Sequence, residues 1–376
     1  FVHDFLDSYG GAERLLHSMH EIYPDAPIFT TRFDPSALPD SFPVQSVREV
    51  TWLRNRLVKL FSKQLTFLYL IAFESINLNE YDVVISSSAN FAKGILTRPD
   101  QIHINYCHTP PRFLYKYEGE SDKRMKWYYA PFVSLLDSYL RIWDYVAAQR
   151  PDYFIANSKN TAARIKTFYH RDSTVIYPPV NIENHTGSID SLDAKDESLK
   201  DASKSSFFLV VSRLAMYKHV ELAIGVCNRL CLPLTVVGVG PEQENLEKLA
   251  GETVTFEGFV SDKRLSELYR SAKALIYTVR DEDFGMTPIE AMSYGCPVIA
   301  HRSGGTLETV IEGKTGEFFD EYSVDGLLDV VENFNSNNYT YENLIKRAND
   351  FSRERFQDEI RTFVDNHTQQ NDNNNA

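Results

Sequence analysis

Short apolar runs rich in β-branched residues alternate with helical patterns along most of the chain. Such a run, bounded by polar or glycine-containing turns, predicts a buried strand. Its alternation with helices predicts parallel sheets built from strand–helix–strand units. The predicted strands are residues 83–86, 103–106, 153–156 and 174–177 in the first half and 207–211, 234–237, 254–256, 275–279 and 298–300 in the second. The predicted fold class is therefore α/β.

The alternation is interrupted at residues 184–206, which are rich in Ser, Asp, Lys and Glu and typical of a solvated linker. A chain of 376 residues also exceeds one ordinary core, so we expect two domains. After Gly316, acidic and amide-rich sequence predicts helices, the last with one apolar face. The predicted divisions are an N-terminal domain over 1–180, a linker over 181–206, a C-terminal domain over 207–349, a crossover helix over 350–368 and a disordered tail over 369–376.

Composition narrows the class of protein. The net charge of -13 argues against a general nucleic-acid binder. The four cysteines show neither zinc spacing nor a disulfide framework, so we expect reduced thiols and a cytosolic setting. No signal peptide and no apolar run of the ~18 residues that a membrane span needs is visible. Because Phe1 already lies in a strand-like pattern, what precedes it stays open.

Residues 50–78 mix large apolar side chains with basic ones, among them Arg54, Arg56 and Lys59. A basic amphipathic helix of this kind can lie on an anionic bilayer, or it can be a core helix with a solvated basic face. The aromatic and basic segment 113–143 has the same two interpretations.

Residues 280–292 join a predicted buried strand to a predicted helix, at the carboxyl end of a strand where open α/β sheets bind ligands. Thr287 suits the N-cap, Pro288 the first helical position, and Glu290 a capping box. A helix start attracts phosphate, whereas the acids Glu282 and Glu290 suit sugar hydroxyls. The spacing of Asp281 and Asp283 could instead hold Mg²⁺ or Mn²⁺.

Three other stretches carry candidate chemistry. Arg213 and Lys218 follow the predicted strand 207–211, and Gly238 begins a tight turn after the predicted strand 234–237. Together these residues suit the binding of a diphosphate, or they are ordinary surface turns. Gly10 and Gly11 open a helix, where they favour an anion or simply make a turn. His108 ends a buried strand at the edge where ligands bind, in a functional or a structural role.

These motifs, in this order, resemble glycosyltransferase family 4, the retaining enzymes of the GT-B fold. The residues that carry the resemblance are Gly10 to Glu13, Cys107 to Pro110, Asn157 and Ser158, Tyr177 to Val180, Ser212 to Lys218, Gly238 to Pro241, Phe256 to Gly258, Glu282 to Glu290 and Gly304 to Glu308. They look closest to bacterial and archaeal mannosyltransferases that build surface polysaccharides. The resemblance implies two Rossmann-like domains facing each other across a cleft and a C-terminal helix that crosses back to the first domain.

The resemblance also implies residue roles. Arg213 and Lys218 would bind the donor diphosphate, and Glu282 would hydrogen-bond the transferred sugar. His108 would lie near that sugar, making His108 and Glu282 the catalytic candidates. The other donor-binding candidates are Gly10, Gly11, Gly238, Phe259, Val260, Asp283, Phe284, Gly285, Met286, Thr287 and Glu290, with Glu290 on the ribose and Phe259 and Val260 on the base. His219, where relatives often carry Arg or Asn, is a departure.

In the family the acceptor attacks on the face from which the diphosphate leaves, so neither a dedicated base nor a metal is implied. We expect a nucleotide-sugar co-substrate, with GDP-mannose favoured, and a glycan or lipid-linked acceptor. We also expect contact with the inner, cytoplasmic face of an anionic membrane. We expect no cofactor and no nucleic-acid partner. The alternatives are a UDP-sugar donor, a nucleotide-sugar epimerase of the same fold, and a catalytically silent partner in glycan assembly.

Overall fold

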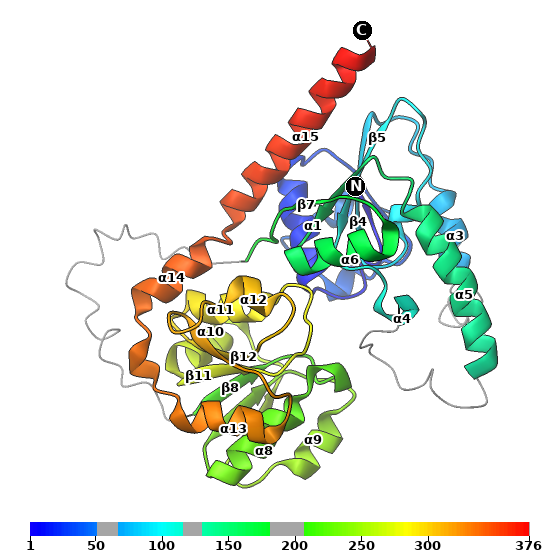
Figure 1. The fold of residues 1–376 in the computed structure, drawn as a ribbon. Coiled ribbons are helices and arrows are strands. Elements are labelled where there is room, and N and C mark those ends of the chain that lie inside the picture. The colour runs from blue at the N-terminus through cyan, green and yellow to red at the C-terminus, as the bar shows by residue number, and fades with distance from the viewer. Residues whose placement is uncertain (51–66, 116–129, 181–206, 376) are drawn as a thin grey trace. The chain divides into compact units, whose positions relative to one another are not determined.

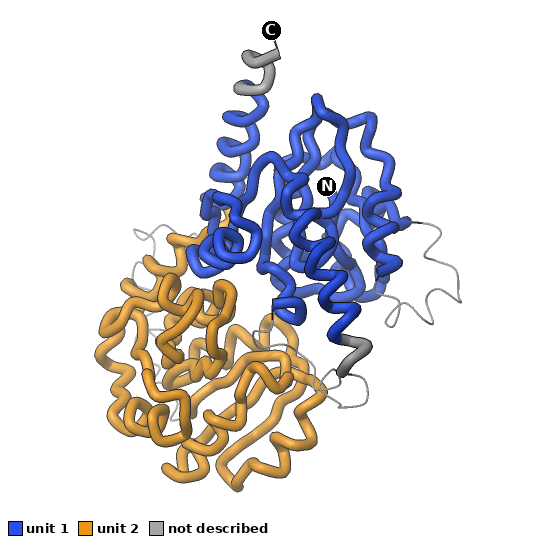
Figure 2. Tube along the Cα trace, turned by 45° about the vertical axis from the view of Figure 1, so that its right-hand side comes forward, with its two compact units in different colours: residues 1–179, 354–376 blue, residues 180–353 orange. Residues whose placement is uncertain are grey.

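The computed structural model describes residues 1–50, 67–115, 130–180 and 207–375 (Figure 1). The chain forms two compact units, Phe1–Pro179 with Glu354–Ala376 and Val180–Arg353 (Figure 2). The predicted linker at 181–206 and most of the basic stretch at 50–78 lie outside the described residues. No helix in the described ranges is both long and apolar enough to cross a membrane.

Unit 1 contains a parallel sheet with the strand order β3-β2-β1-β4-β5-β6-β7 in its described part. Its strands are β1 (Val2–His3), β2 (Ile28–Thr30), β3 (Val47–Glu49), β4 (Val83–Ser88), β5 (Ile102–Cys107), β6 (Tyr153–Ala156) and β7 (Thr174–Val175). The sequence did not predict β2 and β3, because strands of 3 residues each are too short for a recognisable period.

Helices cover both faces of this sheet. The helices are α1 (Gly11–Ile22), α3 (Phe67–Glu74), α4 (Arg112–Tyr115), α5 (Ala130–Ala147), α6 (Lys159–Tyr169) and α15 (Arg353–Asn375), with 3₁₀ turns η1 (Pro35–Ala37), η2 (Val44–Ser46) and η4 (Ala92–Gly94). Neighbouring side chains of a strand point to opposite faces, so Val84 packs in the cluster of α3 and α5, whereas Ile85 packs in that of α1 and α15.

Helix α15 returns from the end of the chain to unit 1, as the resemblance implies. Its Phe356 and Ile360 are fully buried in the same apolar cluster as Leu15 of α1 and Tyr106 of β5. The helix continues to Asn375, through most of the segment 369–376 that the sequence predicts to be a disordered tail. A helix already held by packing extends at little cost, since each added residue gains a hydrogen bond, even where the sequence is polar.

Unit 2 contains a second parallel sheet, with the described order β10-β9-β8-β11-β12-β13. Its strands are β8 (Phe208–Val211), β9 (Leu234–Val237), β10 (Val254–Gly258), β11 (Ala274–Tyr277), β12 (Val298–His301) and β13 (Gly316–Phe319). Strand β13 precedes the helices that the sequence predicts after Gly316, and the sequence did not predict it. A Cβ on Gly316 would lie 2.0 Å from the carbonyl oxygen of Val298, so glycine allows β13 to pair with β12 there.

The helices of unit 2 are α8 (Val220–Leu230), α9 (Gln243–Leu249), α10 (Asp262–Ser271), α11 (Met286–Ser293), α12 (Thr306–Thr309), α13 (Val324–Asn333) and α14 (Tyr341–Asn349), with 3₁₀ turns η7 (Met216–Lys218) and η8 (Ser336–Asn338). Because all its described strands are parallel, their carboxyl ends and the loops that follow them lie at one edge of the sheet. The order reverses between β8 and β11, and the candidate donor residues of unit 2 follow the carboxyl ends of its strands at this edge.

Candidate functional site

An ion pair occupies the point where the strand order of unit 2 reverses. Lys218 follows β8 and Glu282 follows β11, and the Nζ of Lys218 donates a hydrogen bond to Oε2 of Glu282 at 2.8 Å. Both side chains are largely buried, 14% and 16% exposed. An ammonium and a carboxylate are thus held together at the position where open α/β sheets bind ligands.

The surroundings of Lys218 fix this geometry. Its Nζ lies 4.7 Å from the centre of the Tyr217 ring, a cation–π contact. Its carbonyl accepts a 2.7 Å hydrogen bond from the hydroxyl of Thr278, at the end of β11. The hydroxyl of Tyr322 donates in turn to the carbonyl of Thr278 at 2.8 Å. The loops after β8 and β11 are therefore held together by the hydrogen bond from Thr278 to Lys218 as well as by the ion pair.

The loop that carries Glu282 is shaped by the turn after β12. The backbone N–H of Gly305 donates to the carbonyl of Glu282 at 2.8 Å, and the hydroxyl of Ser303 accepts from the N–H of Asp281 at 2.8 Å. Asp281 itself adopts a left-handed conformation with φ of 52°. A Cβ on Gly304 would lie 2.5 Å from the carbonyl oxygen of Glu282, so only glycine lets the two turns approach this closely.

Gly238 has a similar role beside the loop after β8. It adopts φ of 129°, and a Cβ there would lie 1.9 Å from the carbonyl oxygen of Ser212. A Cβ on Gly240 would lie 2.2 Å from the carbonyl oxygen of Leu214. These glycines let the turn after β9 pack against the loop that holds Arg213. This is a structural reason for the glycines that needs no ligand.

The start of α11 corrects a prediction. The N-cap is Gly285, with φ of 92° and no side-chain cap, so the helix begins at Met286 and Thr287 lies inside it. Thr287 is therefore not the cap, Pro288 is not at the first position, and Glu290 lies beyond the capping box. The left-handed glycine turns the chain into the helix two residues earlier than the Thr–Pro signal indicates. The first backbone N–H groups of α11 still point out of the helix start.

The remaining candidates of unit 2 differ in exposure. Phe284 is buried and contacts the ring of Phe351 at 5.4 Å between centroids, so its side chain belongs to the core. Phe259 is 87% exposed just beyond β10. Arg213 is exposed. The half-buried candidates are Val260, Asp283, Met286, Thr287 and Glu290.

Unit 1 has its own strand-order reversal, between β1 and β4, and His108 lies near it. The ring Nε2 of His108 lies 2.8 Å from the hydroxyl of Ser87 at the end of β4. The same hydroxyl lies 3.1 Å from Nδ1 of His3, at the end of β1. Two imidazoles thus share one serine hydroxyl at the ligand edge of this sheet.

Glu13 connects this group to the glycine pair. Its Oε1 lies 3.6 Å from Nε2 of His3, and its Oε2 accepts a 2.7 Å hydrogen bond from the backbone N–H of Gly10. Gly10 is the N-cap of α1 and Gly11 its first residue. The predicted glycine turn and the predicted histidine are therefore linked through His3 and Glu13, which the motifs did not single out as site residues.

Burial and hydrogen bonding shift the pKa values of this group. Burial, aided by nearby His3, lowers the pKa of His108 to about 4, so the ring is neutral at physiological pH. Burial alone would raise the pKa of Glu13. The interaction with His3 at 3.6 Å and the hydrogen bond from the N–H of Gly10 outweigh burial, so the net shift in the pKa is downward and Glu13 is a carboxylate.

Asp4 is another residue that the sequence analysis missed. It is 5% exposed, and its two carboxylate oxygens accept hydrogen bonds of 2.7–2.8 Å from the backbone N–H groups of residues 89, 90, 91 and 92. Asp4 thereby fixes the chain that leaves β4 directly after Ser87 and Ser88. A lone acid after a two-residue strand carries no sequence signal for this role.

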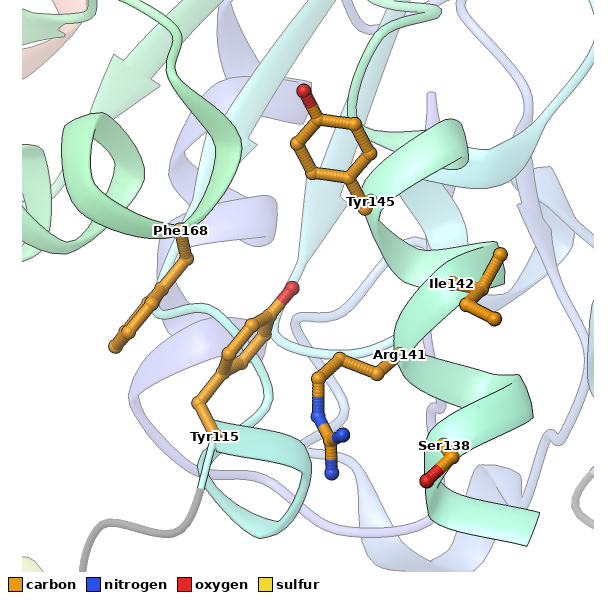
Figure 3. A pocket seen from close by; sticks show the side chains of 6 residues that line it. All are labelled: Tyr115, Ser138, Arg141, Ile142, Tyr145 and Phe168. Atoms are coloured by element: carbon orange, nitrogen blue, oxygen red, sulfur yellow. The ribbon is translucent and has the colours of Figure 1, made fainter. Parts of the chain in front are cut away.

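A cavity of about 480 Å³ in unit 1 lies apart from all predicted site residues (Figure 3). Its lining comes from α4, α5 and α6 and consists of Tyr115, Ser138, Arg141, Ile142, Tyr145 and Phe168. The rings of Tyr115 and Phe168 are stacked at 4.3 Å on one side of it. Within the described ranges, no group of three or more His, Cys, Asp or Glu side chains is arranged to hold a metal ion.

Comparison with known families accounts for nearly the whole chain. The family model "Glycosyltransferase Family 4" matches residues 9–184, and the model "Glycosyl transferases group 1" matches residues 192–351. The structure of HepE from Anabaena in complex with UDP and glucose is similar with a TM-score of 0.63 at 18% identity, over 97% of this chain and 99% of HepE. This likeness confirms the predicted GT-B fold.

Relatives with similar sequences are also glycosyltransferases. The alpha-1,3/1,6-mannosyltransferase ALG2 of Mus musculus is 27% identical over 349 residues, which cover 82% of this chain and 80% of ALG2. The O-antigen chain mannosyltransferase C of Escherichia coli is 23% identical over 306 residues, 79% of this chain and 77% of that protein. With two glycosyltransferase family models end to end and mannosyltransferases among its relatives, the chain belongs to glycosyltransferase family 4.

Proposed function

We propose that this glycosyltransferase moves a hexose, with retention of anomeric configuration, from a nucleotide sugar to a hydroxyl of a lipid-linked or growing glycan. Mannose from GDP-mannose is the favoured donor, because both relatives described above are named mannosyltransferases. HepE, with UDP and glucose, keeps a UDP-sugar as the alternative. The observation that carries the proposal is the Lys218–Glu282 pair at the strand-order reversal of unit 2.

The proposed transfer reaction develops opposite charges beside the Lys218–Glu282 pair. Breaking the anomeric C–O bond builds positive charge on the sugar ring and negative charge on the departing diphosphate. Lys218, Arg213 and the N–H groups at the start of α11 suit the diphosphate, since fixed positive groups stabilise charge that develops in the transition state. Glu282 suits the sugar, whose hydroxyls donate hydrogen bonds to a carboxylate and whose ring becomes cationic.

Other residues complete the donor site in this proposal. Glu290, half-buried on α11, binds the ribose, and the exposed ring of Phe259 with Val260 contacts the base. His108 acts as a neutral group near the transferred sugar, because its lowered pKa leaves it uncharged. The acceptor hydroxyl attacks on the face from which the diphosphate leaves, and a phosphate oxygen takes its proton. The reaction as proposed uses no metal and no cofactor.

A surface on α5 supports an acceptor carried by a membrane. The exposed residues of this helix between 134 and 147 are all uncharged: Ser134, Leu135, Ser138, Tyr139, Ile142, Tyr145 and Val146. Leu135 is 72% and Ile142 66% exposed, and Ile142 also lines the cavity shown in Figure 3. An apolar helix face with tyrosines suits the boundary of a lipid bilayer. The setting proposed is the inner face of the cytoplasmic membrane, consistent with four free cysteines.

A panel of nucleotides read by thermal unfolding tests the donor. Binding to the folded state raises the midpoint by mass action, so GDP is expected to stabilise the protein more than UDP or dTDP. Lys218→Met should reduce the shift for every nucleotide. Equal shifts with all three nucleotides would contradict the GDP-mannose assignment, and no shift with any would favour a silent partner in glycan assembly.

Product analysis tests the reaction. Incubation with donor and acceptor should give an α-linked mannoside, and a β-linkage would overturn retention. Incubation with donor alone separates an epimerase, which would release a changed nucleotide sugar or a free sugar. Added EDTA should leave turnover unchanged. A full loss that Mg²⁺ or Mn²⁺ restores would contradict the metal-free mechanism.

A further inference from the structure

Four side chains form a continuous polar chain at the ligand edge of unit 1. It runs from Glu13 through His3 and Ser87 to His108, over the distances of 3.6, 3.1 and 2.8 Å described above. His3 and Ser87 are almost fully buried, 2% and 0% exposed. Water therefore has little access to the middle of the chain, so the protons on it are set by its own members.

The ends of this chain determine the direction of its hydrogen bonds. Oε1 of Glu13 lies 3.6 Å from Nε2 of His3, which is a charge contact longer than a hydrogen bond. Its negative charge favours the proton of a neutral His3 ring on Nε2, so Nδ1 of His3 accepts. Ser87 must then donate its hydroxyl proton to Nδ1 of His3. The hydroxyl oxygen of Ser87 then accepts a hydrogen bond from Nε2–H of His108. In a neutral His108 this leaves Nδ1 as an acceptor.

The free end of the chain is suited to a ligand. Nδ1 of His108 has no hydrogen-bond partner among the described residues, and the ring is half-buried rather than enclosed. The aromatic rings of Tyr106 and His3 lie beside it, with centroids at 5.4 and 6.5 Å, and restrict its rotation. A fixed acceptor nitrogen at this edge suits a sugar hydroxyl.

We infer that Glu13, His3 and Ser87 are positioning residues that hold the proton of His108 on Nε2, so that its Nδ1 accepts a hydrogen bond from a sugar hydroxyl of the bound substrate. The ligand part of this inference rests on the proposed function. The tautomer part does not, because it concerns the protein without substrate. Neither part follows from the sequence motifs, in which Ser87 and His3 stand far from His108.

The neighbouring serine provides a matched control. Ser86 is also 0% exposed on β4, and its hydroxyl lies 2.7 Å from Nε2 of His103 on β5. It thus makes the same kind of bond as Ser87 but to a different histidine, one at the other end of β5. Ser86→Ala removes a buried hydroxyl from the same strand but changes none of the side chains that link Glu13 to His108.

The test is the position of the ring proton, read by ¹⁵N NMR on the full-length protein labelled in its histidines, at about pH 8 where histidine side chains are ordinarily neutral. His108→Gln identifies the signals of His108 by their loss. The native protein should carry the proton on Nε2. Ser87→Ala should convert His108 to a mixture of tautomers, and Ser86→Ala should leave its signals unchanged. A proton on Nδ1 of native His108, or no change in Ser87→Ala, would overturn the inference.

A second variant covers the case in which Ser87→Ala does not fold. Glu13 is 13% exposed at the outer end of the chain, and Glu13→Gln keeps its shape while removing its charge. The new side-chain amide can donate to His3, which permits the reverse order of bonds, so the His108 signals should shift toward Nδ1–H. Unchanged signals would contradict the inference.

Kinetics separates this inference from the proposed function. Ser87→Ala should lower kcat by about tenfold, the effect of about one lost hydrogen bond, with little change in KM for the donor. Ser87→Thr keeps the hydroxyl and should therefore have a kcat close to that of the native protein. If the tautomer is as inferred but His108→Gln leaves kcat unchanged, the role of His108 in transfer fails while the hydrogen-bonded chain stands.

Discussion

Lys218 and Glu282 form a 2.8 Å ion pair although 64 residues separate them in the chain. Each follows one of the two adjacent strands at which the order of the unit 2 sheet reverses. In the proposed donor complex these side chains have different tasks, because one faces a diphosphate and the other a sugar. Substitution of each should therefore affect binding and turnover differently.

Lys218→Met should weaken binding of the nucleoside diphosphate, since it removes a positive charge from the phosphate site. Glu282→Gln should leave this binding intact or strengthen it, because the charge of the Glu282 carboxylate no longer competes with the phosphates for Lys218. Its turnover should fall by a factor on the order of 10²–10³, the usual loss for one group that stabilises transition-state charge. Calorimetric titration with GDP and initial rates measure both. A parallel loss of nucleotide affinity in Glu282→Gln would show that its assigned role is wrong.

Gly304→Ala should destabilise unit 2 and displace the Glu282 loop. The added Cβ would lie 2.5 Å from the carbonyl oxygen of Glu282, in a residue with φ of 60°. Gly313→Ala is the control, because Gly313 has φ of 69° but no atom within 4 Å of its Cβ position. The control should cost about 1–2 kcal/mol from backbone strain alone. Urea unfolding should show a larger loss for Gly304→Ala, and equal losses would argue against the close contact.

Much of the fold was predictable because its strands are continuous buried runs. Strands β6 and β9 have the predicted limits, and the apolar face of α15 indicated a packed helix. The polarity after Gly316 concealed β13, since a short strand with a central acid gains its burial only by pairing with β12. Local signals also misplaced the start of α11, because the conformation of Gly285 outweighed the Thr–Pro pattern.

The candidate site was predictable where the motifs name chemical groups, and less so where tertiary contacts assign them. Lys218 and Glu282 were predicted individually, but their ion pair required knowledge of the strand order. His3 and Ser87 carry no local signal, because a buried histidine or serine occurs in many strands for structural reasons alone. Their relation to His108 follows from parallel strands that end at one edge of the sheet.

Phe259→Ala should weaken donor binding without affecting stability. The ring is 87% exposed, so its loss should change the free energy of unfolding by less than about 0.5 kcal/mol. Stacking on a base contributes roughly 1 kcal/mol, which corresponds to about fivefold in affinity. Leu249→Ala, 55% exposed at the end of α9, is the control and should change neither quantity. Unaltered affinity for GDP in Phe259→Ala would remove this ring from the donor site.

Charges on the exposed face of α5 should weaken membrane binding. The double variant Leu135→Glu and Ile142→Glu should lose flotation with vesicles of phosphatidylglycerol and phosphatidylcholine, because both side chains face solvent and tolerate charge in the folded protein. Leu307→Glu, 52% exposed on α12, is the control. Neutralising Arg54, Arg56 and Lys59 tests the basic stretch outside the described residues. Flotation that none of these changes reduces would exclude both surfaces.

Stability should fall as the pH drops below about 6.5, and His103 should be one cause. Burial in the sheet, with the nearby charges of Arg150 and Arg171, lowers its pKa from 6.5 to about 3. Below pH 6.5 the unfolded state binds a proton that the folded state does not, so protonation favours unfolding. The unfolding free energy contributed by this histidine should decline by up to about 1.4 kcal/mol per pH unit until the pH approaches the folded pKa.

His103→Gln isolates this effect. At about pH 8 His103 is neutral in both states, so the variant measured there gives the loss from the Ser86 contact and packing alone. Between about pH 6.5 and 4 the variant should show a shallower decline than the native protein, since one proton-linked step is absent. His108, with its pKa lowered to about 4, keeps part of the slope in both proteins. Urea unfolding at each pH measures the two slopes, and parallel curves would show that His103 is not held neutral by the fold.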